Sequence, residues 1–170
     1  MITPWQVQQP ALLLAAVLFA APAAAQIVLS ESEFEAGSRF AAFFKVERGC
    51  GSSPTVALEV QIPAGVTVLQ LPDKPGWTLR ATHTGAAGKQ RVAAVTWRGR
   101  LEAAAQDQFG LLLQLPDRPG ALYFPVVQRC ESGETRWTEI PGEGQAARKM
   151  PHPATVLKLT PSRAPVHDHH

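Results

Sequence analysis

Residues 56–62 read Val56-Ala57-Leu58-Glu59-Val60-Gln61-Ile62, and their branched apolar side chains recur at every second position. Because successive side chains of a β-strand point to opposite faces, this period of two predicts a strand with one face turned to a core. Similar apolar patterns predict further strands at 40–46, 77–79, 92–97, 111–115, 122–127, 137–140 and 156–159.

Turn signals rich in Gly and Pro lie between these segments, at 49–52, 63–65, 74–76, 117–120 and 141–144. These residues supply the preset or positive φ that a chain reversal needs. Short strands with regularly spaced turns predict an all-β protein built as an antiparallel β-sandwich. Residues 102–106 are alanine-rich and are long enough for one helical turn only.

The first 25 residues are typical of a secretory signal peptide, with an apolar run over 12–21 and small residues at Ala23-Ala24-Ala25. Residues 1–10 contain no Lys or Arg, so a membrane anchor and a buried helix are the alternatives. The run is shorter than the roughly 20 residues that span a bilayer, and Pro22 ends a helix. We therefore expect cleavage after Ala25, a periplasmic or secreted location and no stable membrane span in the mature chain.

The residues after this leader are expected to form one domain over 26–160, followed by a flexible tail over 161–170. In the whole chain, 16 Lys and Arg barely outnumber 14 Asp and Glu, and both signs are scattered. This distribution excludes the clustered basic face that is expected of a nucleic-acid-binding protein.

The chain has two cysteines, Cys50 and Cys130. In an oxidising compartment such an isolated pair usually forms a disulfide, which stabilises the fold by about 4 kcal/mol for a loop of this size. The alternative is a pair of metal-binding thiolates. The sequence favours the disulfide, because it has no Cys-x-x-Cys spacing and no His close to either cysteine.

No motif for catalysis stands out. The chain lacks a Gly-x-Ser-x-Gly elbow, a His-Glu-x-x-His helix and a phosphate-binding glycine loop. His83 and His152 are expected to be exposed surface histidines. We therefore expect a protein that is not an enzyme.

The chain ends in His167-Asp168-His169-His170, which brings imidazole and carboxylate groups close together. Neutral imidazole suits Cu(II) and Zn(II), so this tail is a candidate metal site. Its affinity is expected to be modest, since a flexible tail loses conformational entropy on binding. A cloning remnant and a merely solvated terminus are the alternatives.

Six short motifs occur in a fixed order along the chain. They lie at 48–52 (Arg-Gly-Cys-Gly-Ser), 62–66 (Ile-Pro-Ala-Gly-Val), 74–77 (Lys-Pro-Gly-Trp), 95–97 (Val-Thr-Trp), 122–130 (Leu-Tyr-Phe-Pro-Val-Val-Gln-Arg-Cys) and 133–141 (Gly-Glu-Thr-Arg-Trp-Thr-Glu-Ile-Pro). The ordered set resembles the YcnI-like family of exported bacterial copper-binding domains. The resemblance covers about residues 26–159, which is nearly the whole expected mature chain.

The resemblance implies an immunoglobulin-like β-sandwich with a Cu(II) site at its amino terminus. In the family, the first mature residue is a histidine whose amine and imidazole chelate copper, with a carboxylate assisting and a tryptophan beside the metal. Trp137 matches that tryptophan, although its residue type also fits a core aromatic near the disulfide. Asp107 is the candidate carboxylate, with Asp73 as a weaker alternative. The implied partners are other periplasmic copper chaperones and membrane copper transporters.

This chain departs from the family pattern at its expected first mature residue, Gln26. Glutamine has no imidazole, and an amino-terminal glutamine can also cyclise and lose its free amine. Two hypotheses follow. The protein is an exported copper-binding protein for copper storage, delivery or tolerance, with an altered amino-terminal site for which Asp107 is the candidate carboxylate. The tail residues His167, His169 and His170 either fold back to complete this site or bind copper independently. Alternatively, the protein is a metal-free sandwich that acts as an adaptor or interaction domain.

Overall fold

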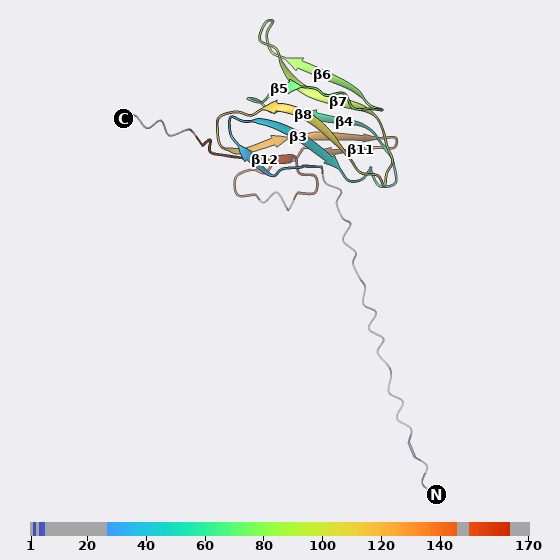
Figure 1. The fold of residues 1–170 in the computed structure, drawn as a ribbon. Coiled ribbons are helices and arrows are strands. Elements are labelled where there is room, and N and C mark those ends of the chain that lie inside the picture. Colours follow the sequence, from blue (N-terminus) through green and yellow to red (C-terminus); the bar gives the residue numbers. More distant parts are fainter. Residues whose placement is uncertain (1, 3, 6–26, 146–149, 164–170) are drawn as a thin grey trace.

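The computed structural model describes residues 2, 4, 5, 27–145 and 150–163, and the domain that it describes is an all-β sandwich (Figure 1). Its strands are β1 (Val28–Leu29), β2 (Glu33–Glu35), β3 (Arg39–Val46), β4 (Thr55–Gln61), β5 (Thr67–Gln70), β6 (Thr78–Thr84), β7 (Arg91–Leu101), β8 (Asp107–Gln114), β9 (Gly120–Phe124), β10 (Val126–Cys130), β11 (Glu134–Trp137) and β12 (Thr155–Thr160). No helix within these residues is long and apolar enough to cross a bilayer.

The strands form a four-stranded sheet, β1-β3-β8-β5, and a five-stranded sheet, β11-β10-β4-β7-β6. A smaller sheet, β2-β12-β9, completes the fold. All pairs are antiparallel except β12 and β2, which run parallel. The β6–β7 hairpin projects from the body of the sandwich (Figure 1). The predicted all-β sandwich is therefore confirmed, with one parallel pair that the strand pattern did not predict.

One hydrophobic core lies between the two larger sheets. Strand β3 alternates exposed and buried residues along its whole length and places Phe40 and Phe44 inside. Phe109 of β8 packs edge-on against Trp97 of β7, with ring centroids 5.5 Å apart. The period of two in each strand therefore places large apolar side chains of both sheets in one cluster.

The predicted strand at 122–127 is wrong as a single element. It is two strands, β9 and β10, which separate at Pro125. Strand β9 pairs with β12 in the small sheet, whereas β10 pairs with β4 and β11 in the five-stranded sheet. Proline has no N–H to donate to a ladder, and the Pro125 carbonyl accepts a bond from the Gln61 N–H at 2.9 Å. The chain changes sheet at this residue.

Two other expectations also need correction. The strand predicted at 137–140 is β11, which ends at Trp137, and Ile140 is 51% exposed. Residues 102–106 form a turn closed by a bond from the Ala105 N–H to the Glu102 carbonyl at 2.9 Å, not a helical turn. The short strands β1, β2 and β5 were not predicted, since two to four residues show no measurable periodicity.

Gly99 of β7 lies under the indole of Trp77, and a Cβ added there would lie 2.5 Å from Trp77 Cδ2. Trp77 is itself packed edge-on against Phe109, with ring centroids 4.8 Å apart. We expect Gly99→Ala to lower the free energy of unfolding by about 1–3 kcal/mol, because the ring has to move. Urea unfolding measures this change.

Gly142→Ala is the matched control, because a Cβ at Gly142 would approach nothing closer than 3.6 Å. We expect this variant to stay within about 0.5 kcal/mol of the parent. Equal stability of the two alanine variants would contradict the close packing at Gly99.

Candidate metal centre at Trp137

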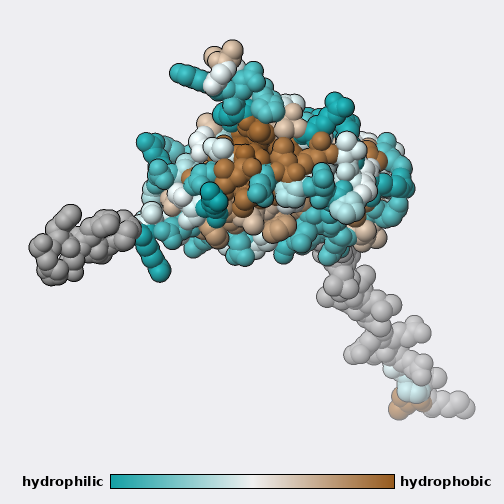
Figure 2. Space-filling view, turned by 45° about the horizontal axis from the view of Figure 1, so that its top comes forward, coloured by the Kyte–Doolittle hydropathy of each residue, from teal (hydrophilic) through white to brown (hydrophobic). Residues whose placement is uncertain are grey.

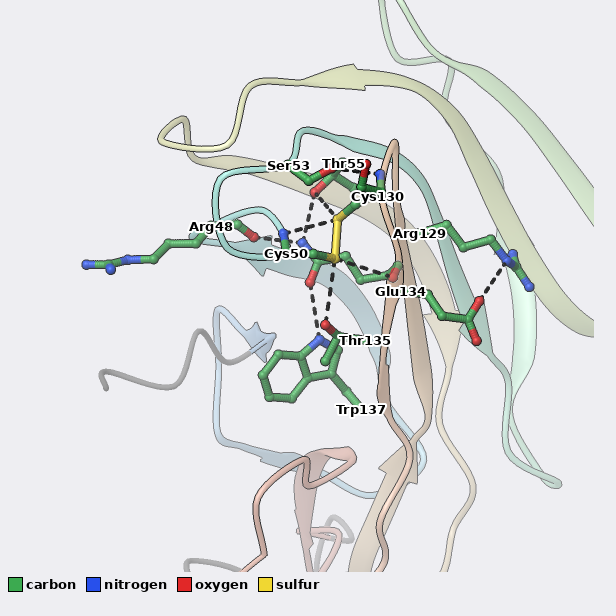
Figure 3. Close-up of a disulfide and its surroundings, with 11 residues drawn as sticks. Arg48, Cys50, Ser53, Thr55, Arg129, Cys130, Glu134, Thr135 and Trp137 are labelled. Atoms are coloured by element: carbon green, nitrogen blue, oxygen red, sulfur yellow. Dashed lines mark hydrogen bonds and ion pairs between the residues drawn. A yellow bond between two sulfur atoms is a disulfide. The ribbon is translucent and has the colours of Figure 1, made fainter. Parts of the chain in front are cut away.

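Trp137 is the last residue of β11 and is 4% exposed. Its Nε1–H donates to Gln128 Oε1 on the neighbouring strand β10 at 3.2 Å (Figure 3). Gln128 is 1% exposed, and its Nε2 donates to the Arg48 carbonyl at 2.7 Å and to Thr55 Oγ1 at 2.8 Å. This buried network holds the indole in one orientation, since every polar group in it has a partner.

The predicted disulfide between Cys50 and Cys130 is present. It joins the loop after β3 to the end of β10, and Figure 3 shows Trp137 on one side of it. Thr135 Oγ1 donates to Cys50 Sγ at 3.6 Å from the strand that carries Trp137. The disulfide excludes the alternative of two metal-binding thiolates, because its sulfurs are bonded to each other. Trp137 is thus both a core aromatic and a neighbour of the disulfide.

His152 lies beside the indole of Trp137, and Glu139 lies beside His152. The His152 and Trp137 rings meet edge-on, with centroids 5.2 Å apart. His152 Nδ1 is 3.9 Å from Glu139 Oε1, and the two side chains are 50% and 40% exposed. We call Trp137, Glu139 and His152 the Trp137 cluster. It places a partly exposed imidazole next to a buried indole and a partly exposed carboxylate next to that imidazole.

At Ile27 the chain is anchored to Thr155, on the segment that follows His152. Ile27 is 2% exposed and belongs to the same core as Trp137. Its carbonyl accepts a bond from Thr155 Oγ1 at 2.7 Å, and Thr155 follows His152 by three residues. Gln26, the predicted altered ligand, lies outside the described residues and directly precedes Ile27.

Asp107, the predicted carboxylate ligand, begins β8 on the four-stranded sheet. Its Oδ1 accepts a bond from Lys74 Nζ at 2.9 Å. Lys74 also donates to the Gln108 carbonyl at 3.0 Å and lies 4.9 Å from the centre of the Phe109 ring. Asp73 and Asp107 both line an open cavity of about 570 Å³ on this sheet. Among the described residues, no hydrogen bond or ion pair joins Asp107 to the Trp137 cluster.

The described residues contain no group of three or more His, Cys, Asp or Glu side chains that could hold one ion. The predicted tail ligands His167, His169 and His170 lie outside the part of the chain that the structure describes. Within the described residues, the candidate side-chain donors near Trp137 are His152 and its neighbour Glu139. His152 was predicted to be an exposed histidine, and its side chain is 50% exposed. The missed signal is Glu139 two residues after Trp137, inside the sixth family motif.

Arg100 lies at the surface near the disulfide and pairs with Glu102 and Glu131. The Arg100 guanidinium donates hydrogen bonds to the carboxylates of Glu102 and, with a smaller effect, Glu131, and these bonds raise its pKa above the ordinary value. Both carboxylates thereby share one permanent cation. They are poorer candidates for metal binding than Glu139, whose ion-pair partner within the described residues is His152.

Two packed sheets with a disulfide and a short third sheet define an immunoglobulin-like β-sandwich protein. The chain belongs to the family described as Domain of unknown function (DUF1775), whose model matches residues 26–159. The YcnI-like family that the sequence resembles is this family, so the predicted family membership is confirmed.

Among solved structures, an uncharacterized protein from Nocardia farcinica with an immunoglobulin-like fold superposes with a TM-score of 0.65. It is 22% identical, and the match covers 79% of this chain and 97% of that one. The seventh ScaB type I cohesin from Pseudobacteroides cellulosolvens is 7% identical, with a TM-score of 0.43 over 85% and 97% of the two chains. No curated protein matches the chain. The first similarity supports the fold.

Proposed function

We propose that this chain is an exported copper-binding protein for copper storage, delivery or tolerance, with an altered Cu(II) site near its amino terminus. The observation that carries the proposal is the anchoring of Ile27 to Thr155, three residues after the His152 that packs against Trp137. Cleavage after Ala25 would leave an amine one residue from this anchor. Family membership supports the same position for the copper site, because the resemblance implies copper at the amino terminus beside a tryptophan.

The donors available to such a site suit Cu(II), which prefers nitrogen and oxygen ligands in a tetragonal arrangement. The amine of residue 26 and the imidazoles of His167, His169 and His170 are candidate nitrogen donors from the chain ends. Asp107 would have to give up its ion pair with Lys74 to take part. The buried indole of Trp137 would limit solvent access to a bound ion. The proposal assigns binding rather than catalysis, with zinc as a second ion for the tail.

The test is a Cu(II) titration of the mature protein, in which binding is measured by calorimetry and the copper site is observed by electron paramagnetic resonance. Intact-mass analysis establishes the first residue and any ring closure there. We expect saturable binding, with a lower stoichiometry when His167, His169 and His170 are all changed to Ala. If neither form takes up copper, the proposed function is wrong.

The alternative function, a metal-free adaptor domain that docks periplasmic copper chaperones or other partners, is favoured by one observation. Figure 2 shows a continuous hydrophobic surface next to the projecting hairpin. Apolar residues Ala41, Phe43 and Leu112 line the open cavity on the four-stranded sheet, and Phe43 is 38% exposed. Contiguous apolar surface on a soluble domain marks interaction sites. Absence of copper binding in a correctly folded protein would favour this function.

A further inference from the structure

We propose that His152 and Glu139 are the side-chain ligands of a Cu(II) site against Trp137, and that His152 supplies the imidazole that Gln26 lacks. This inference rests on the proposed function and deepens it by naming the ligands. It does not use the tail histidines or Asp107.

The distance between the two donors fits a shared ion. Imidazole nitrogen and carboxylate oxygen bind divalent zinc at about 2.0–2.2 Å, and similar lengths serve for copper, so two donors of one ion stand at most about 4.3 Å apart. His152 Nδ1 and Glu139 Oε1 are 3.9 Å apart. Both atoms can therefore reach one ion after small side-chain rotations.

The backbone holds these side chains together before any ion binds. Glu139 N–H donates to the His152 carbonyl at 3.1 Å, and Ala154 N–H donates to the Glu139 carbonyl at 2.7 Å. Pro151 and Pro153 flank His152 and restrict its main chain. His152 N–H also donates to Glu139 Oε1 at 2.8 Å, which orients the carboxylate. Since a carboxylate has about four lone-pair positions, this bond leaves acceptor capacity for an ion.

The surroundings favour a cation that arrives from solvent. Both ligand side chains are about half exposed, while the indole behind His152 is buried. Glu139 has no Lys or Arg partner within the described residues, in contrast to Asp107 with Lys74. An arriving cation therefore meets a carboxylate that is not already neutralised.

Two side chains do not complete a copper site. The described residues supply no third His, Cys, Asp or Glu at this point. The remaining positions are open to water. The site is thus a two-residue anchor completed by solvent ligands, for which we expect moderate affinity.

The experiment uses the full mature chain with His167, His169 and His170 changed to Ala, so that the tail does not bind. Cu(II) affinity is measured by competition with a chelator, and the ligand nitrogens are identified by pulsed electron paramagnetic resonance. Removing a ligand should cost at least the roughly tenfold loss that follows from altering an outer-shell partner. We expect His152→Ala and Glu139→Gln each to weaken binding tenfold or more, and His152→Ala to remove the imidazole signal.

His83→Ala is the matched control, because His83 is an exposed histidine on β6 and should leave affinity unchanged. His152→Gln repeats the test with a side chain of similar polarity, and thermal unfolding checks that each variant folds. Gln26→His added to His152→Ala should restore the imidazole signal and the affinity, and failure to restore them would show that the two positions do not serve one ion.

The outcomes separate the two proposals. If the tail-substituted parent binds copper and His152→Ala binds equally well, the assignment of His152 is wrong and the copper function stands. If copper binds only when the tail is intact, the assignment of His152 is likewise wrong and the copper function stands. If no form binds copper, both proposals are wrong.

Discussion

Replacing both Cys50 and Cys130 with Ser is expected to lower the free energy of unfolding by about 4 kcal/mol. The disulfide joins residues that are 80 positions apart, so its loss restores much conformational freedom to the unfolded chain. Domains are commonly stable by only about 5–15 kcal/mol, so the change is a large fraction of the total. Urea unfolding followed by tryptophan fluorescence measures it.

Reduction of the parent protein is the control, because it opens the same bond without a substitution. The reduced parent and the double serine variant should unfold at similar urea concentrations. A loss below about 1 kcal/mol in both would contradict the argument, since that would mean that the rest of the fold already restricts the unfolded chain.

Gln128→Leu is expected to cost about 3 kcal/mol or more of stability, although leucine is apolar and similar in size. The substitution leaves Trp137 Nε1, Thr55 Oγ1 and the Arg48 carbonyl without the partner that each has in the structure. An unsatisfied buried polar group costs about 1–3 kcal/mol, and the lost partners of buried Trp137 and Thr55 outweigh the gain from a more apolar side chain. Chemical denaturation measures the loss.

Gln108→Leu is the control for this substitution. Gln108 is exposed on β8, and the hydrogen bonds that it makes there use its backbone, so its change should be within about 0.5 kcal/mol. The near-ultraviolet circular dichroism of Gln128→Leu should also change, because Trp137 loses its orienting bond. Equal stability of the two leucine variants would contradict a structural role for the buried network.

The strands that the sequence predicts well are those with long alternating patterns. Strands β3 and β8 bury alternate residues, and this alternation follows from local backbone geometry. Strand β4 alternates from Leu58 onward only, because its pairing with β7 has a register shift between Thr55 and Ala57, and Val56 is only partly buried. The 122–127 run was predicted as one strand because its apolar residues are continuous. Its division at Pro125 depends on which partner strands lie on either side, and those partners are distant in sequence.

In the candidate site too, the features that depend on local sequence were predicted, and the contacts between distant residues were not. Trp137 and the two cysteines were identified from motifs, and the structure places them side by side (Figure 3). Asp107 was chosen by residue type and motif position, and the ion pair with Lys74 was not visible in the sequence. Glu139 and His152 are 13 residues apart, and only the main-chain bonds between their segments bring them together beside the indole.

The amino-acid sequence alone determined the family, the all-β class and the cysteine pair, because motif order and a period of two are properties of neighbouring residues. The tertiary structure decided which polar groups meet. It placed Gln128 under Trp137, Lys74 on Asp107, and His152 against Glu139. These contacts depend on how strands that are distant in sequence pair and pack. No local sequence pattern contains that information.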